Sequence, residues 1–176
     1  MENIDKLKSS LAQEEKKMLQ IRRELVRESL SDNLNVEHRL ELVAEKNGIS
    51  YINDSKSSDV DSTWFALEKM TKPIVWIVGG VDKGNDYSLL LDLVKDRVKA
   101  IVCLGKENNK LFSAFQFEVP MMIIDADSMA EAVQLSNVAA KSGDVVLLSP
   151  ACASYEMFES YEDRGEQFRN AVQLIK

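Results

Sequence analysis

Apolar residues recur with a helical spacing over the first thirty residues of the chain. This segment contains no Gly or Pro, and its apolar side chains return every three or four positions, as on one face of a helix. The stripe consists of Ile4, Leu7, Leu11, Met18, Ile21 and Leu25, and Glu14 interrupts it. The pattern predicts one long amphipathic helix, or two joined ones. A solvated helix with one apolar face and a coiled coil both fit, because the repeat is short.

A β-hairpin is expected after the polar stretch 31–35, which breaks the helix. Residues 39–45 and 49–54 alternate apolar and polar side chains with the period of a half-buried strand. Asn47 and Gly48, between the two runs, readily take the positive φ angles that a two-residue hairpin turn requires. The pattern therefore predicts two antiparallel strands.

The rest of the chain alternates between short apolar runs and amphipathic segments. The apolar runs are 73–80, 99–105, 119–125 and 143–150, and the amphipathic segments are 60–70, 86–98, 107–116, 128–142 and 161–176. Strands that are apolar on both faces and separated by helices are typical of a parallel sheet covered on both sides. We therefore expect an α/β domain with a Rossmann-like, mostly parallel sheet, preceded by the hairpin and the long helix.

Composition and charge argue against several classes of function. The net charge of −7 disfavours a general nucleic-acid binder, which needs a basic face. The two cysteines, Cys103 and Cys152, lack the spacing of a zinc site, and the single histidine is His38. No apolar run is long enough to cross a membrane, and the charged N-terminus does not fit a signal peptide. We expect no metal site in this chain and a reducing, cytoplasmic setting.

Polar loops at the expected strand ends are the candidate binding elements, because ligands of such sheets bind at the carboxyl ends of the strands. The loop 54–59, DSKSSD, precedes a helix and fits either a plain helix cap or an anion site at the helix N-terminus. The loop 79–86, GGVDKGND, fits either a plain turn or a backbone that approaches a ligand closely, beside Lys83. The spacing of a phosphate-binding P-loop is absent from the sequence.

The third candidate loop, 149–154, has the sequence SPACAS. Cys152 lies between two alanines, and the one histidine that could activate its thiol lies in a different part of the chain. We therefore interpret Cys152 as a buried structural residue and not as a nucleophile. Ser149 and Ser154 bracket the turn and are better placed to hold a carboxylate.

The three loops, taken together and in this order, resemble one known family. The resemblance is to the carboxyl-terminal domain of the Mur ligases, nearest to their D-glutamate-adding branch, and it is carried by NVEHRLE, INDSKSSDVDSTWFAL, VGGVDKGNDYSLL and VVLLSPACASYEMFESYEDRGEQF. It runs from about residue 21 to residue 176, and residues 1–20 do not match. The chain is accordingly divided into a helical segment, 1–34, and a ligase C-terminal domain, 35–176.

The resemblance implies an ATP-dependent step of peptidoglycan synthesis. In that family, ATP phosphorylates the alanine carboxylate of UDP-N-acetylmuramoyl-L-alanine, and the amine of D-glutamate attacks the acyl phosphate to form an amide. The C-terminal domain positions D-glutamate and closes the ATP site, whereas the P-loop, the magnesium ligands and the UDP-sugar site belong to the central and N-terminal domains. The resemblance therefore implies that this chain alone has no catalytic residue, holds no ATP or magnesium, and shows no ligase activity.

The resemblance also implies roles for individual residues. Those implied to contact D-glutamate are Lys83, Ser154, Ser58 and Tyr161, and those implied to face the nucleotide are Arg39, Asp54 and Lys56. A dianionic amino acid needs fixed positive charge and several hydrogen-bond donors, which the first group supplies. The family usually has DSKATN where this chain has DSKSSD. Ser58 thus keeps a hydroxyl, whereas Asp59 replaces an asparagine with an acid, which does not suit an anion contact.

Two other functions stay open from the sequence. The N-terminal helix favours an interaction module, or an engineered fusion, that self-associates through residues 1–30 and carries an inactive ligase domain. A free-standing binder that keeps a weak site for D-glutamate and nucleotide is the other. Neither of them involves nucleic acid or a membrane.

Overall fold

The computed structural model describes residues 2–32, 34, 36–120 and 122–176, and the chain divides into two compact units, 1–32 and 33–176. The predicted helix break over 31–35 and the predicted domain boundary at 34/35 include residues 33 and 35, which lie outside the described ones. The first unit consists of one helix, α1 (Glu2–Ser31), so the long helix is confirmed. The apolar side chains of its stripe are 43–66% exposed.

The second unit is built on a six-stranded sheet with the strand order β1-β2-β6-β3-β4-β5. The strands are β1 (Glu41–Lys46), β2 (Ile49–Asn53), β3 (Ile74–Val78), β4 (Val98–Leu104), β5 (Met122–Ala126) and β6 (Val145–Leu148). β1 runs antiparallel to β2, and the other neighbouring strands are parallel. The predicted α/β fold with a mostly parallel sheet is therefore confirmed.

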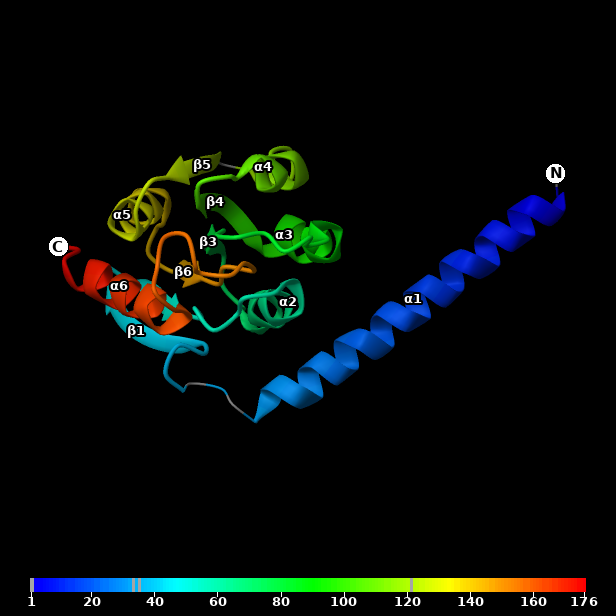
Figure 1. Ribbon diagram of the computed structural model, residues 1–176, viewed down its shortest axis with the longest axis horizontal. Helices are drawn as coiled ribbons and strands as arrows, with labels where there is room; N and C mark the ends of the chain where they lie inside the picture. Colours follow the sequence, from blue (N-terminus) through cyan, green and yellow to red (C-terminus); the bar gives the residue numbers. More distant parts are fainter. Residues whose placement is uncertain (1, 33, 35, 121) are drawn as a thin grey trace. The chain divides into compact units, whose positions relative to one another are not determined.

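Helices cover both faces of this sheet (Figure 1). One face carries α5 (Met129–Ala139) and α6 (Tyr161–Gln173), and the other carries α2 (Val60–Lys69), α3 (Leu91–Arg97) and α4 (Asn109–Phe115). The predicted helix over 86–98 divides into a short 3₁₀ turn, Tyr87–Leu90, and α3. Phe168 of α6 belongs to the apolar core of the first face, and Trp76 packs edge-on against Phe115 on the second.

The hairpin turn has the predicted geometry. Asn47 and Gly48 have φ angles of 54° and 76°, and the strands pair directly beside them, Lys46 with Ile49. The second strand, β2, then pairs in parallel with β6. The hairpin is thus the edge of the main sheet and not a separate unit.

The position of β6 decides which loops meet. β6 is the last strand in the sequence, but it pairs with β2 on one side and with β3 on the other. The loops that follow these three strands, 54–59, 79–86 and 149–160, therefore lie next to one another at the carboxyl edge of the sheet. They contain the three sequences that carry the resemblance at the strand ends.

Gly79 and Gly80 allow the chain to pack closely on itself. Their φ angles of 125° and 129° lie in a region that other residues rarely adopt. A Cβ on Gly79 would lie 2.6 Å from the carbonyl oxygen of Leu104, and one on Gly80 would lie 2.3 Å from that of Ala153. The close approach that the glycines suggested is present, but the approaching group is the protein's own backbone.

Gly80→Ala is expected to destabilise the domain by roughly 3 kcal/mol or more, because the added methyl group has neither an allowed φ nor space. Gly84→Ala is the matched control: Gly84 has a φ of 89°, but nothing lies within 4 Å of an added Cβ. Its cost should be that of the backbone alone, about 1–2 kcal/mol. Urea denaturation followed by circular dichroism measures both variants. Equal losses would contradict the steric explanation.

Candidate functional site

Backbone hydrogen bonds join two of the three loops at the carboxyl edge. The Val81 N–H donates to the Ala153 carbonyl at 2.9 Å, and the Ala153 N–H donates to the Val81 carbonyl at 3.2 Å. Just beyond this pair, the Lys83 Nζ lies over the Tyr155 ring, 5.1 Å from the ring centroid. The structure therefore brings the predicted residues Lys83 and Ser154 onto two loops that are fastened together.

Ser154 begins the turn that leads to α6. Its carbonyl accepts hydrogen bonds from the N–H groups of Met157 and Phe158, and the residue is only 6% exposed. Among the described residues, none forms a hydrogen bond with the Ser154 hydroxyl. The backbone of Ser154 is thus held in place while its hydroxyl keeps its capacity to bind a ligand.

The loop 54–59 is attached to the loop 149–160 and caps a helix. The Ala151 N–H donates to the Ser57 carbonyl at 3.0 Å, which joins the two loops. The Asp59 carboxylate accepts a hydrogen bond from the Ser62 N–H at 2.8 Å at the start of α2. Of the two interpretations of this loop, the helix cap is therefore confirmed for Asp59. The anion site stays a prediction for Ser58.

Asp54 is the buried centre of the residues predicted to face the nucleotide. Its Oδ1 accepts the Leu40 N–H at 3.2 Å, and its Oδ2 accepts the Ser149 hydroxyl at 2.8 Å. The Arg39 Nη1 lies 4.0 Å from Oδ1 and donates to the Ser57 hydroxyl at 3.1 Å. Because Asp54 is fully buried, its influence on a bound nucleotide would pass through Arg39.

Burial raises the pKa of Asp54 to about 6, although hydrogen bonds from Ser57 and Ser149 and the charge of Arg39 oppose the rise. Ser149 is itself fully buried, and its hydroxyl lies 3.1 Å from the Thr63 hydroxyl. The expectation that Ser149 holds a ligand carboxylate is therefore wrong, because its side chain points into the protein. Lys56, in contrast, is exposed.

Two left-handed residues flank Arg39. His38 and Leu40 have φ angles of 59° and 46°, and backbone strain of this kind clusters where a side chain must be held in a defined position. His38 is buried, and its Nδ1 lies 2.9 Å from the Asn53 amide nitrogen. The Tyr161 ring meets the His38 ring edge-on, with the centroids 6.2 Å apart. The structure thus places Tyr161 beside the Arg39 segment, whereas the sequence grouped it with the D-glutamate residues.

Sequence reasoning missed Arg164, which is 1% exposed in the first turn of α6. Its guanidinium donates to the Ser55 hydroxyl at 3.0 Å, the Ser55 carbonyl at 2.8 Å, the Cys152 carbonyl at 2.9 Å and the Ser58 hydroxyl at 3.2 Å. Arg164 therefore ties α6 to two of the three loops. An arginine in a charged helical stretch looks exposed from sequence, so the signal for this role was weak.

Cys152 is buried, as predicted. It is 2% exposed, burial raises the pKa of its thiol, and its Sγ lies 3.2 Å from the Tyr87 hydroxyl. A thiol acts as a nucleophile in its ionised form, which this environment disfavours. The structural interpretation of Cys152 therefore holds.

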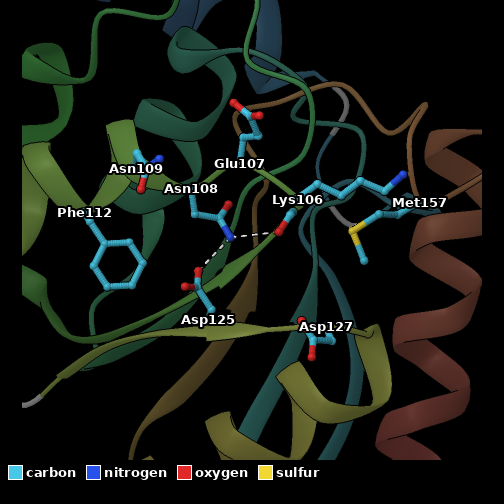
Figure 2. A pocket seen from close by; sticks show the side chains of 9 residues that line it. Lys106, Glu107, Asn108, Asn109, Phe112, Asp125, Asp127 and Met157 are labelled. Atoms are coloured by element: carbon cyan, nitrogen blue, oxygen red, sulfur yellow. Dashed lines mark hydrogen bonds between the residues drawn. The ribbon is translucent and has the colours of Figure 1, made fainter.

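A hollow of about 660 Å³ opens at the carboxyl ends of β4 and β5 (Figure 2). It is lined by Gly105, Lys106, Glu107, Asn108, Asn109, Phe112, Asp125, Asp127 and Met157. The Asn108 amide donates to the Gly105 carbonyl at 3.0 Å and to Asp125 at 2.7 Å, as Figure 2 shows. The residues predicted from sequence to bind ligands lie outside this lining, although Met157 shares a turn with Ser154.

The described part of the chain was also searched for metal-binding clusters and for membrane-spanning helices. Within it, no three acidic, histidine or cysteine side chains lie close enough together to hold a metal ion. Within the same residues, no helix combines the length and apolar character needed to cross a membrane.

Asp54 is expected to make the domain less stable as the pH rises from 4 to 7, by roughly 2–3 kcal/mol. Its pKa of about 6 in the folded protein exceeds the ordinary value of 3.8, so the folded state binds the proton more tightly. The stabilisation is present in full below the lower value and is lost as the pH passes the higher one.

Urea denaturation of the wild type and of Asp54→Asn at several pH values isolates this contribution, because other carboxyl groups titrate in both proteins. The free energy of unfolding of the wild type should fall relative to that of the variant across this range. A difference that stays constant with pH would contradict the assignment of the raised pKa to Asp54.

The chain is similar to known proteins of one family. A family model described as "Mur ligase, glutamate ligase domain" matches residues 38–152. The UDP-N-acetylmuramoylalanine--D-glutamate ligase of Christiangramia forsetii is 53% identical over 158 residues, which are 90% of this chain and 35% of that protein. The protein of the same name from Porphyromonas gingivalis is 50% identical over 156 residues, 89% of this chain and 34% of that one. The chain thus spans about a third of the length of these relatives.

Among solved structures, the MurF ligase of Thermotoga maritima in complex with ADP matches with a TM-score of 0.48 and 16% identity, over 78% of this chain and 32% of that one. The family model covers more than half of the chain. Its match includes the loops 54–59 and 79–86 and reaches Cys152 in the third loop. The chain therefore belongs to the Mur ligases, in the family of their glutamate ligase domain.

Proposed function

We propose that this chain is the D-glutamate-holding domain of a cytoplasmic, ATP-dependent ligase that adds D-glutamate to UDP-N-acetylmuramoyl-L-alanine in peptidoglycan synthesis. The names of its relatives supply the substrate class. The observation that carries the proposal is the backbone pair Val81–Ala153, which fastens the Lys83 loop to the Ser154 loop. An ammonium group and a hydroxyl on joined loops at the carboxyl edge of a parallel sheet suit an anionic amino acid.

Each carboxylate of D-glutamate has partners in this arrangement. The Lys83 ammonium supplies a full positive charge, and the hydroxyls of Ser154 and Ser58 donate hydrogen bonds. Tyr161 is kept as a further part of the site, because its carbonyl accepts the Ser55 hydroxyl at 2.7 Å and so attaches it to the loop of Ser58. An amino acid held in this way presents its amine to the activated carboxylate of the second substrate, and such orientation lowers the barrier to bond formation.

The nucleotide-facing part of the proposal rests on Arg39 and Lys56. ATP supplies the phosphoryl group that activates the carboxylate of the UDP-sugar substrate. Asp54 and Ser57 orient the Arg39 guanidinium. The exposed Lys56 adds a second cation next to the Arg39 segment, because its N–H donates to the His38 carbonyl at 3.0 Å. The magnesium ligands and the phosphate-binding loop are assigned to the remainder of the ligase. Amide formation by this chain alone is accordingly not expected.

Titration of the ¹⁵N-labelled chain with D-glutamate tests the proposal. The backbone signals of Lys83 and Ser154 should shift first, with a millimolar dissociation constant, because a third of a ligase encloses the amino acid incompletely. Lys83→Ala and Ser154→Ala should each weaken binding by about five- to tenfold, the loss of one charge-assisted hydrogen bond. Cys152→Ala, in the same loop as Ser154, is the matched control and should bind as the wild type does.

If D-glutamate causes no saturable shift of the backbone signals, the proposal is contradicted. Shifts of the same size with L-glutamate would also contradict it, because a site built for the D-isomer distinguishes the two. A larger loss of D-glutamate affinity in Cys152→Ala than in Ser154→Ala would indicate that the Cys152 thiol takes part in binding.

The exposed apolar stripe of α1 favours a second candidate function, self-association. A helix of 30 residues with apolar side chains at 43–66% exposure gains free energy by burying them against a partner. Most of the stability of a helix in a protein comes from contacts that its apolar face makes with other elements. A second copy of α1 would provide such contacts along the stripe.

Sedimentation velocity over a wide range of protein concentrations tests the self-association. We expect a dimer that becomes a monomer when residues 1–20 are removed and when Leu11 is replaced in Leu11→Glu. Ser9→Glu adds the same charge on the face of the helix opposite the apolar stripe and should leave the dimer intact. A wild-type chain that is monomeric at every concentration excludes this function.

A further inference from the structure

Arg164 carries a buried positive charge without an ion pair among the described residues. Its side chain is 1% exposed, and burial lowers the pKa of its guanidinium to about 10, so it remains protonated at neutral pH. Its hydrogen-bond acceptors are two serine hydroxyls and two backbone carbonyls, all neutral. The charge of Asp54 acts on the guanidinium through space and raises its pKa, but no carboxylate among the described residues lies within ion-pair distance. Buried charges in proteins are usually paired, so this environment favours the binding of a further anion nearby.

The contact with Ser58 determines how that serine can bind a ligand. The Arg164 Nη2 donates to the Ser58 Oγ at 3.2 Å. A guanidinium has donors and no acceptor, so the proton of the Ser58 hydroxyl cannot point back at it and must go to another acceptor. Ser58 is half-buried, and its N–H donates to the Lys56 carbonyl at 3.0 Å, which fixes its backbone. Ser58 is thereby prepared as a donor toward the outside of the loop.

A second contact relates Ser58 to Ser154. The Arg164 Nη1 donates to the Cys152 carbonyl at 2.9 Å, two residues before Ser154. The same guanidinium holds the loop of Ser58 through the Ser55 carbonyl at 2.8 Å. One rigid, planar group therefore sets the separation of the two loops whose hydroxyls are proposed to bind the same amino acid.

We propose that Arg164 is a positioning residue for the D-glutamate site, which it serves by fixing Ser58 as a hydrogen-bond donor. This inference rests on the proposed function and names a residue that does not touch the ligand. The substrate group that it serves is a carboxylate, because an outward O–H donor that is itself hydrogen-bonded to a buried cation favours an anion.

If Arg164 only stabilised the fold, its replacement would have different effects. Arg164 would then matter for unfolding, and its replacement would affect ligand binding only as far as the domain loosens. The coupling between Arg164 and Ser58 separates the two roles, because an effect that passes through Ser58 disappears once the Ser58 hydroxyl is removed.

Binding of D-glutamate to the wild type, Arg164→Lys, Ser58→Ala and the double variant tests the coupling by NMR titration. Each single variant should weaken binding by about five- to tenfold, and the double variant should bind no more weakly than the weaker single one. Ser62→Ala is the matched control: it removes a serine hydroxyl that contacts Asp59 and not Arg164, leaves Ser58 unchanged and should alter the affinity less than twofold. Losses that multiply in the double variant overturn the proposal, as does wild-type affinity in Arg164→Lys.

A measurement on the wild type covers the case in which Arg164→Lys does not fold. The side-chain N–H signals of Arg164 should shift when D-glutamate is added, whereas those of Arg169 should not. Arg169 lies on the same helix, is 23% exposed and pairs with Glu166 and Glu41. If D-glutamate shifts the signals of Lys83 and Ser154 but not those of Arg164, the proposed function stands and the role of Arg164 is refuted. If D-glutamate shifts none of them, both are refuted.

Discussion

The parallel pairing of β6 between β2 and β3 is the constraint on which the candidate site depends. β6 is short and fully buried, and its backbone is hydrogen-bonded to a neighbour on each side. Its apolar side chains gain the free energy of burial on both faces of the sheet, which fixes its place in the middle. The loops that leave the three strands must then emerge side by side, and the Val81–Ala153 and Ala151–Ser57 hydrogen bonds fasten them to one another.

Two buried charged side chains also hold these loops in place. Asp54, in the loop 54–59, and Arg164, in α6, are both buried, and the structure satisfies each of them with hydroxyl, carbonyl or N–H partners. Such groups stabilise a fold poorly, because removing them from water costs nearly as much as their contacts return. They do impose defined positions on their partners. Gly165, next to Arg164, lets α6 approach, since an added Cβ would lie 2.2 Å from the His38 Nδ1.

The loops of the candidate site were predictable from short stretches of sequence, because each follows an apolar strand and the carboxyl-edge rule selects such loops. The assignment of Lys83 and Ser154 to D-glutamate came from the family resemblance and stays a prediction. Ser149 was misjudged because a hydroxyl at a strand end can face either way, and here it turns inward to Asp54. Arg164 was not singled out, and His38 was considered only as an activator of Cys152, because the burial of a charged or polar side chain depends on elements distant in the sequence.

The sequence by itself determined the elements and their kinds: the long helix, the Asn47–Gly48 hairpin, the apolar strands and the amphipathic helices between them. These follow from local periodicity and turn chemistry, which act over a few residues. Only the tertiary structure decided that β6 inserts between β2 and β3, that Asp54 is enclosed and that one guanidinium joins two loops and a helix. Those features arise from contacts between residues some 100 positions apart, such as Arg164 and Ser55, and no local pattern encodes them.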